Sequence, residues 1–302
     1  MNCPTCTSLA KRFGKDCKRN QRYRCKSCKR TFTESHEKPL SEMRLPMAKV
    51  LLCLKLLVEG NSIRSTSRIA DVEKKTVLSL LKLAGRKCEQ VMDEKVRDVA
   101  VETVEVDEIW TFVRKKEGHK TEDEQNDPFI GDAYTFVAIE ANTKLVLCYV
   151  LGRRDSETAL EFIKKLSKIT KGRFQLTSDG FKPYIDAVEK VFGVDIDFAQ
   201  TIKSFSESVS EPVKTVIMGN PDPDKISTSY VERQNLTIRM SMRRLTRRTN
   251  GFSKKWENLN YALALHFSYY NFCRPHESLR VTPAMESGIT DHIWELWELL
   301  MI

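Results

Sequence analysis

The sequence is poor in histidine and has no long apolar segment. Only five of its 302 residues are histidine, and none has the spacing of a metal-binding pair or a catalytic triad, so we do not expect histidine to supply acid–base chemistry. The longest apolar run, residues 47–58, is interrupted by Lys49 and Lys55 and is too short to span a bilayer. No signal peptide is recognisable at the polar N-terminus. We therefore expect a soluble cytoplasmic protein without a membrane partner.

The charge of the chain is positive but unevenly distributed. The net charge is +9, and it divides into +12 for residues 1–100, −6 for residues 101–231 and +3 for residues 232–302. A length of 302 residues allows more than one domain. Two basic ends around an acidic middle are typical of a protein that holds DNA around a metal-binding centre.

Nine cysteines in a chain expected inside the cell indicate metal ligation rather than a disulfide framework. Four of them form two C-x₂-C pairs: Cys3 with Cys6, and Cys25 with Cys28. This spacing predicts one tetrahedral, structural Zn²⁺ site, and the metal must hold together a segment too small to bury a core. The ten Lys and Arg residues around the pairs indicate contact with DNA phosphates. Cys17 is expected to lie on a loop outside the site.

Residues 36–95 are predicted to form a helical DNA-binding domain. After a linker, Pro46 fits a first helical turn and Gly60 fits the position just past a helix end. Residues 61–86 then have the pattern of a helix-turn-helix, with Asp71 in the turn where glycine is common. Three residues near the start of its second helix are predicted to face the major groove of DNA: Lys74, Lys75 and Thr76. A plain helical hairpin is the alternative.

The middle of the chain is predicted to form an α/β domain. From residue 101 the period of the sequence changes to two, which indicates β-strands. The predicted elements are strands 101–113, 133–140 and 144–151, helix 156–169 with Ser156 as N-cap, strand 174–177 and helix 182–192. Three antiparallel strands followed by helix, strand and helix is the order of a ribonuclease H-like core, a mixed sheet with flanking helices. Residues 200–228 are predicted to be a loop with one strand, 213–218.

Residues 229–249 are predicted to form one long basic helix that ends at Asn250 and Gly251. Its apolar face consists of Val231, Ile238, Met242 and Leu245. Glu232 lies on a second face. The arginines of the two polar faces are predicted to bind DNA: Arg239, Arg243, Arg244 and Arg247. An ordinary amphipathic helix with a solvated basic face is the alternative. Two further helices are expected over residues 253–272 and 291–302.

Three acidic residues are predicted to share a metal site. Asp107 lies within the first strand, Asp179 ends a later strand, and Glu232 lies on the basic helix. If the two strands are neighbours in the sheet, both aspartates project at one edge, where the helix can bring Glu232. Three carboxylates suit two Mg²⁺ ions, or Mn²⁺, which prefer oxygen ligands and promote cleavage and transfer of phosphodiesters.

Each aspartate taken alone is more simply explained as a structural hydrogen-bonding residue, so the prediction depends on the combination of the three. Glu108 is the rival of Asp107. Strand alternation places Glu108 on the opposite face, but a shift of one residue in register would exchange the two.

Several motifs resemble those of the first insertion-sequence family of bacterial transposases. The matching blocks are Cys3-Pro-x-Cys6, Gln21-Arg-Tyr-Arg-Cys25-x-x-Cys28-x-Arg30-Thr-Phe32, Val106-Asp107-Glu108-x-Trp110, Thr177-Ser-Asp179-Gly180-x-x-x-Tyr184, Val231-Glu232-Arg233-x-Asn235-Leu236-Thr-x-Arg239 and Arg244-Leu245-x-Arg247-x-Thr249-x-x-Phe252-Ser253-Lys254. The similarity covers most of the chain. The resemblance implies a ribonuclease H-like transposase in which Asp107, Asp179 and Glu232 are the catalytic metal ligands. It also implies that Arg239 contacts the DNA end.

The chain departs from this family in two places. One is the long loop 200–228. The other is Asn271-Phe-Cys-Arg274-Pro-His276-x-x-Leu279, which resembles the tails of other insertion-sequence transposases and is expected to be a packing loop.

We expect four segments: a zinc ribbon (1–35), a helix-turn-helix domain (36–95), a catalytic domain (96–252) and a helical tail (253–302). The expected function is a transposase that binds terminal inverted repeats, cleaves 3′ ends by metal-assisted hydrolysis and joins them to target DNA. It would act as a dimer or higher homo-oligomer associated with the nucleoid. The alternatives are a DNA-binding regulator derived from a transposase, without catalysis, and a structure-specific nuclease without joining activity.

Overall fold

The computed structural model describes residues 1–17, 20–33, 40, 43–202 and 212–301. The chain divides into two units, Met1–Glu42 and Met43–Ile302. The expected domain limits at residues 95 and 252 both fall inside the second unit. Parts of the predicted linker and of the predicted loop 200–228 lie outside the described residues.

The first unit contains a three-stranded antiparallel sheet. Its strands are β1 (Ala10–Lys15), β2 (Gln21–Cys25) and β3 (Thr31–Thr33), with β2 in the centre. Tyr23 and Phe32 stack across β2 and β3 with ring centroids 6.0 Å apart. The buried apolar residues among the described part of this unit are Cys3, Ala10, Tyr23 and Cys25. So small a core agrees with a fold that depends on cysteine ligation.

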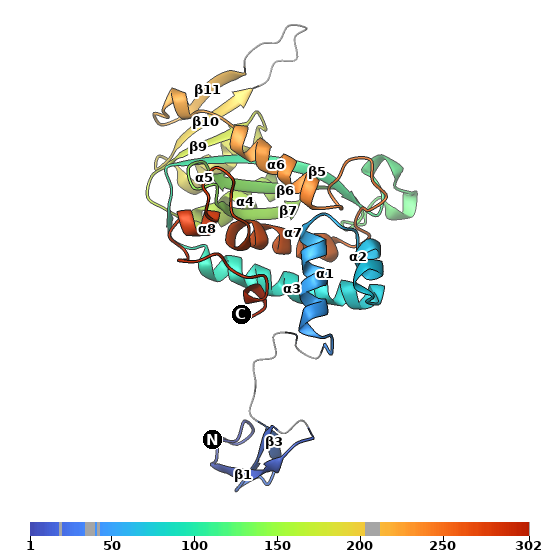
Figure 1. The fold of residues 1–302 in the computed structure, drawn as a ribbon. Coiled ribbons are helices and arrows are strands. Elements are labelled where there is room, and N and C mark those ends of the chain that lie inside the picture. Colours follow the sequence, from blue (N-terminus) through green and yellow to red (C-terminus); the bar gives the residue numbers. More distant parts are fainter. Residues whose placement is uncertain (18–19, 34–39, 41–42, 203–211, 302) are drawn as a thin grey trace. The chain divides into compact units, whose positions relative to one another are not determined.

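Three helices open the second unit (Figure 1): α1 (Met47–Val58), α2 (Ile63–Ala70) and α3 (Lys74–Lys95). The hydroxyl of Ser62 accepts a hydrogen bond from the backbone N–H of Ser65 at 3.0 Å and caps α2. Asp71 has a left-handed backbone conformation, with φ 49°, where the chain turns from α2 towards α3. The two predicted helices are therefore present, and the second continues to Lys95 through residues that are expected to form a charged helical connector, 87–100.

A helix from the end of the chain packs along α3. This helix is α7 (Trp256–Ser268), which a π-helical turn (Tyr269–Cys273) extends and α8 (Pro283–Glu286) follows. Gly85 of α3 lies so close to α7 that a Cβ atom at position 85 would be 2.4 Å from the Cβ of Tyr261. The hydroxyl of Ser268 donates a hydrogen bond to the carbonyl of Cys88 at 3.1 Å. This crossing joins the helical segment and the tail in one unit.

Six strands form the mixed sheet of the second unit (Figure 1). They are β5 (Thr103–Val113), β6 (Gly131–Glu140), β7 (Val146–Gly152), β9 (Gln175–Asp179), β10 (Asp197–Ile202) and β11 (Val213–Met218), in the spatial order β11-β10-β9-β5-β6-β7. β5, β6 and β7 are antiparallel, β9 and β10 run parallel to β5, and β11 is antiparallel to β10. Two short strands, β4 (Val99–Ala100) and β8 (Thr170–Lys171), pair separately. The predicted mixed α/β class is confirmed.

Helices cover both faces of the six-stranded sheet. α4 (Ser156–Ile169) and α5 (Pro183–Phe192) lie on one face, where Phe136 of β6 contacts Phe162 and Tyr184 with ring centroids 5.7 and 6.2 Å apart. α6 (Ser229–Ser241) crosses β5 on the other face. Asp155, and not the predicted Ser156, caps α4, because the Asp155 carboxylate accepts a hydrogen bond from the N–H of Thr158 at 2.8 Å.

Two further elements differ from what the sequence pattern predicts. It does not predict β10, whose residues Phe198 to Thr201 are all buried, so the strand has no alternation of apolar and polar residues. The helix predicted over residues 291–302 is wrong, because its described part forms only one 3₁₀ turn, Glu298–Leu300. The N–H of Trp294 donates to the carbonyl of Phe272 at 3.0 Å and ties this segment to the end of α7 instead. None of the helices in the described ranges has the length and apolar character needed to cross a membrane.

Candidate functional site

The end of β9 brings the two predicted aspartates together. β9 runs parallel to β5, and their pairing ends where Val106 lies opposite Ser178. Asp107 and Asp179 are the next residues on the two strands. Carboxylate oxygens of these aspartates and of Glu108 all lie within 4.8 Å of one another. The condition on which the shared site depends, that the two strands are neighbours in the sheet, is therefore met.

Glu108 belongs to this acidic cluster although strand alternation places it on the opposite face of β5. It pairs with Phe136 on the face that α5 covers, and its side chain is only 2% exposed. The pairing of β5 with β9 ends before residues 107 and 108, so side chains on either face of β5 can extend towards the end of β9. Carboxylates from both faces therefore reach one space. The expectation that Glu108 points away from the site is wrong, and only the strand order could have corrected it.

Two carboxylates of β5 hold α6 over this cluster. Glu105 is buried, and its Oε2 accepts hydrogen bonds from the backbone N–H groups of Tyr230 and Val231 at 2.7 and 3.0 Å. These are first-turn donors for which a helix has no internal acceptor. One turn later, Asn235 Nδ2 donates to Asp107 Oδ2 at 2.8 Å. Sequence reasoning missed Glu105 and Asn235, although residue 105 shares a strand face with residue 107.

Glu232 lies on the first turn of α6 and lines the same cleft as Asp107 and Asp179. This acidic cleft has a volume of about 770 Å³. Glu232 is exposed, and its Oε1 accepts a hydrogen bond from Thr228 Oγ1 at 2.9 Å. Its oxygens are not among those that cluster within 4.8 Å. The structure thus gathers all three predicted carboxylates in one cleft, with Glu232 on its wall.

Arg154 is a cleft residue that sequence reasoning missed. Its Nε donates to Glu108 Oε2 at 3.1 Å, and its Nη2 donates to Asp179 Oδ2 at 3.4 Å. The guanidinium lies 4.1 Å from the centroid of the Phe181 ring, which supports its position. Arg154 precedes α4 in the turn after β7. One cation therefore offsets part of the repulsion among three carboxylates.

The predicted helix over residues 229–249 is wrong beyond Ser241, where α6 ends. Met242 is extended, with φ −125° and ψ 105°. Arg239 Nη1 donates to the carbonyl of Leu245 at 3.0 Å, so the chain turns back against the last turn of α6. Met242 and Leu245 nevertheless stay buried, as predicted. A turn at this place buries the two side chains just as a helix would.

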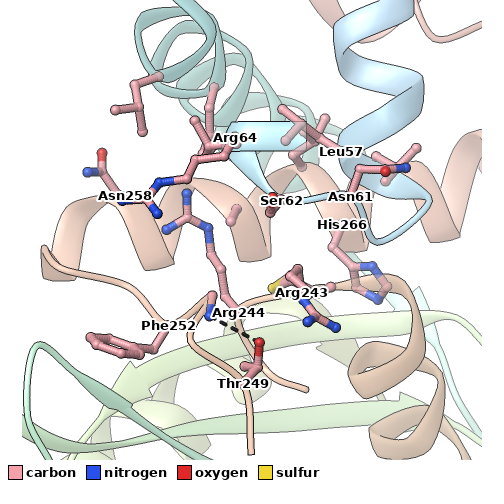
Figure 2. Close-up of a pocket in the computed structure, with 18 of the residues that line it drawn as sticks. Leu57, Asn61, Ser62, Arg64, Arg243, Arg244, Thr249, Phe252, Asn258 and His266 are labelled. Atoms are coloured by element: carbon pink, nitrogen blue, oxygen red, sulfur yellow. Dashed lines mark hydrogen bonds between the residues drawn. The ribbon is translucent and has the colours of Figure 1, made fainter. Parts of the chain in front are cut away.

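The early end of α6 separates the arginines that were predicted to share one DNA-binding surface. Arg239 and Arg247 line the acidic cleft. Arg243 and Arg244 line a second cavity (Figure 2). Arg244 Nη1 donates there to Ser253 Oγ at 2.9 Å, and burial lowers the pKa of Arg244 to about 10. The arginines thus occupy two separate places.

The acidic cluster has the properties of a divalent-cation site. Burial raises the pKa of Asp107 to about 6 and that of Glu108 to about 7, and the charge of Asp179 adds to both shifts. Glu108 Oε1 is buried and has no hydrogen-bond partner among the described residues. Convergent carboxylates with an unsatisfied oxygen fit a hard cation such as Mg²⁺ or Mn²⁺, which takes oxygen ligands and favours their charged form.

The four predicted zinc ligands of the first unit also come together. Their sulfur atoms all lie within 4.8 Å of one another, with Cys3 3.6 Å from Cys28 and Cys6 3.4 Å from Cys25. Zinc–sulfur bonds of about 2.3 Å in a tetrahedron place sulfur atoms about 3.8 Å apart, so this cluster fits Zn²⁺. Backbone hydrogen bonding lowers the pKa of the Cys6 thiol to about 6. Cys17 is exposed and outside the cluster, as expected.

The residues predicted to face the major groove lie on the first turn of α3. Lys74 and Lys75 are exposed, and Thr76 is half-buried. The Glu73 carboxylate caps this turn by accepting hydrogen bonds from the N–H groups of Lys75 and Thr76. Lys74 also lines the second cavity. DNA binding by these three residues stays a prediction.

Of the comparisons with known proteins, only the one with solved structures finds similar chains. No family model and no curated protein matches the chain. Among solved structures, the chain is similar to the piggyBac transposase in a synaptic complex with hairpin DNA, at 10% identity and a TM-score of 0.39, over 89% of this chain and 72% of that chain. It is also similar to the Mos1 mariner paired-end complex with Mn, at 12% identity and a TM-score of 0.27, over 78% of each chain.

Proposed function

We propose that this chain is a DNA transposase with a ribonuclease H-like catalytic core. The observation that supports this most is the acidic cleft, which combines carboxylates from β5, β9 and α6 with three arginines. Its acidic residues are Asp107, Glu108, Asp179 and Glu232, and its arginines are Arg154, Arg239 and Arg247. A cleft of this kind can take up divalent cations and a phosphodiester together, because each offsets the charge of the other.

The strand order supports the ribonuclease H-like assignment. β7, β6 and β5 form an antiparallel meander, and β9 and β10 continue the sheet in parallel on the other side of β5. Asp107 lies on the central strand β5, and Asp179 lies at the carboxyl end of β9. Open α/β sheets bind ligands at such strand ends.

Asp107, Asp179 and Glu232 would hold two Mg²⁺ ions, or Mn²⁺, and Glu108 is placed to join them. Such ions, when bound, activate the attacking water or 3′-hydroxyl and stabilise the leaving oxygen. Asn235 holds the Asp107 carboxylate in place through its 2.8 Å hydrogen bond. In this proposal these residues hold the DNA in position, so that its 3′ end is cleaved and then joined to target DNA.

DNA is bound by the basic parts of both units in this proposal. The ribbon with its single Zn²⁺ and the first turn of α3, with Lys74, Lys75 and Thr76, bind the terminal inverted repeats. Arg239 and Arg247 contact phosphates in the cleft. Because two ends must be held together for transposition, the protein acts as a dimer or higher homo-oligomer on nucleoid DNA. Binding is expected to fall steeply with salt.

Substitution of the acidic residues tests the proposal. Asp107→Asn, Asp179→Asn and Glu232→Gln should each abolish Mg²⁺-dependent cleavage and joining of end-labelled DNA to a plasmid, while binding of the ends is kept. Asp186→Asn is the matched control, because Asp186 is exposed on α5 and does not line the cleft. Undiminished cleavage by all three variants would refute the site.

The same assay separates the other two functions. A wild-type protein that binds a promoter but cleaves no DNA would be a regulator. A protein that cleaves the labelled ends and never joins them to the plasmid would be a nuclease.

A further inference from the structure

A second cavity in the same unit, the basic cavity, has the opposite charge. It measures about 770 Å³, and its lining comes from α1, α2, α3, α7 and the segment after α6 (Figure 2). Five of the described residues that line it are cationic and none is acidic. The cations are Arg64, Lys74, Arg243, Arg244 and Lys254. Such a concentration of one sign of charge in a concave site attracts anions.

Two of these cations extend towards one another. Arg64 from α2 and Arg244 from the segment after α6 reach into the cavity from different sides (Figure 2). No carboxylate lies within ion-pair distance of either guanidinium in the described part of the chain. Among the described residues the Arg244 guanidinium donates one hydrogen bond, to Ser253 Oγ, and the side chain is half-buried. A half-buried cation without a counter-ion has lost part of its hydration, so an anionic ligand would stabilise this arrangement.

The cavity also contains polar atoms that lack a partner. His266 is only 3% exposed, and neither of its ring nitrogens has a hydrogen-bond partner among the described residues. The Oδ1 of Asn258 is buried and unpartnered in the same sense. Both residues line the cavity (Figure 2). Buried polar groups in proteins are almost always hydrogen-bonded, so these atoms point to a ligand with donors and acceptors of its own.

The remaining wall is largely apolar. Its apolar side chains include Leu78, Leu81, Met242, Phe252 and Leu265. A cavity of this size is far larger than a phosphate ion needs, and apolar walls with a few convergent polar groups are typical of sites for small organic ligands. The ligand should therefore carry an apolar body in addition to its negative charge.

We propose that the basic cavity binds a nucleoside phosphate. The phosphate lies between Arg64 and Arg244, on the side of Asn258, and the base lies against the apolar wall towards His266 (Figure 2). A free mononucleotide and the terminal nucleotide of a DNA strand present the same chemistry. The site is independent of the catalytic role proposed above, because the basic cavity and the acidic cleft share no lining residue.

Calorimetric titration of the full chain in magnesium-free buffer tests this proposal. The probes are dAMP, deoxyadenosine and a short 5′-phosphorylated DNA strand. We expect dAMP to bind at least about tenfold more tightly than deoxyadenosine, because a phosphate between two guanidinium groups makes charge-assisted hydrogen bonds. Arg64→Gln should weaken dAMP binding about tenfold.

Arg68→Gln is the matched control. Arg68 is exposed on the same helix, α2, but does not line the cavity, so this variant should bind dAMP within about twofold of the wild type. Arg64 is exposed as well, so Arg64→Gln should fold even where Arg244→Gln does not. Binding of both dAMP and the strand, each weakened by Arg64→Gln and not by Arg68→Gln, identifies a site for free nucleotides. Binding of the strand alone, with the same response to the two variants, identifies a site for a strand end.

Three results would overturn the proposal. They are equal binding of dAMP and deoxyadenosine, equal losses in Arg64→Gln and Arg68→Gln, and no binding of either phosphate-bearing probe at millimolar concentration. Asp107→Asn should keep full dAMP affinity. A failure of the proposed catalysis and a failure of this site are therefore distinguishable.

Discussion

The acidic cleft and the basic cavity have the same volume, about 770 Å³ each, and lie in one unit, yet they are built in different ways. The acidic cleft is assembled at strand ends, where parallel pairing of β5 and β9 forces Asp107 and Asp179 together. The basic cavity is assembled from helices and from an irregular segment. A sheet brings distant carboxylates together through its hydrogen bonds, whereas the basic cavity depends on where one helix ends.

The charges of the two places are also balanced differently. In the acidic cleft, Arg154 pairs with both Glu108 and Asp179. In the basic cavity, no acidic side chain in the described part of the chain faces Arg64 or Arg244. The segment after Arg239 supplies arginines to both places, because α6 ends at Ser241 and the chain turns back. The acidic cleft contains its own counter-ion, Arg154, whereas the basic cavity leaves that role to a ligand.

The largest expected effect is the loss of Mg²⁺-dependent cleavage without a change in dAMP binding. Asp107→Asn should lower Mg²⁺-dependent cleavage about 10³-fold or more, because a lost carboxylate removes stabilisation made mainly in the transition state. Calorimetry on the same protein should show unchanged dAMP binding. Arg64→Gln should show the reverse in calorimetry, with weaker dAMP binding and unchanged Mg²⁺ affinity. Parallel losses in both assays would mean that the two places are coupled.

A smaller effect is expected from pH, through His266 beside the basic cavity. Burial lowers the pKa of His266 to about 4, below its value of about 6.5 in an unfolded chain. The unfolded state therefore binds the proton first, and the free energy of unfolding should fall as pH drops from about 6.5 to about 4, by up to about 3 kcal/mol.

The measurement is urea unfolding at several pH values for the wild type and for His266→Gln. The difference between the two profiles isolates His266 from Asp107 and Glu108, whose raised pKa values act in the opposite direction. Parallel profiles would show that His266 is not buried in its neutral form.

A third effect concerns the helix crossing that supports the basic cavity. Gly85→Ala places a methyl group 2.4 Å from the Tyr261 Cβ, which should cost about 2 kcal/mol of unfolding free energy by overpacking, despite the better helix propensity of alanine. Chemical denaturation measures the change. Gly118→Ala is the control, because no atom lies within 4 Å of its Cβ position. A stabilised Gly85→Ala protein would contradict the close packing of α3 and α7.

The smallest effect on both places should come from the first unit. Cys3→Ser should reduce bound zinc from about one per chain to none, because three thiolates hold Zn²⁺ much less tightly than four. The thermal transition of the second unit and its dAMP binding should not change, since the four cysteines lie in a separate unit. Metal analysis and calorimetry give the two readings. Unchanged zinc content would refute the Cys₄ site.

Much of the fold follows from periodicity and spacing. The strand over residues 103–113 and the helix over residues 156–169 have patterns that local preferences explain, and both form. Four of the five cysteines of the first unit come together as their C-x₂-C spacing predicts. β10 does not follow, because both of its faces are buried and its sequence lacks the alternation that marks a strand.

Other features depend on long-range contacts. Glu108 joins the acidic cluster only because β9 ends beside it. The N–H groups at the start of α6 find their acceptor in Glu105, far away in the sequence. Neither contact can be predicted from local residue patterns, because the partner lies on another element.

The amino-acid sequence by itself determined which residues carry charge and metal-binding chemistry, and it determined the periodic strands and helices around them, since both are local properties. Only the tertiary structure decided that Glu108 and Arg154 belong to the acidic cleft and that the arginines after Ser241 divide between two cavities. The reason is that these positions depend on where β9 and α6 end and on contacts with segments distant in the chain, such as the hydrogen bond that Thr111 of β5 donates to the carbonyl of Arg244.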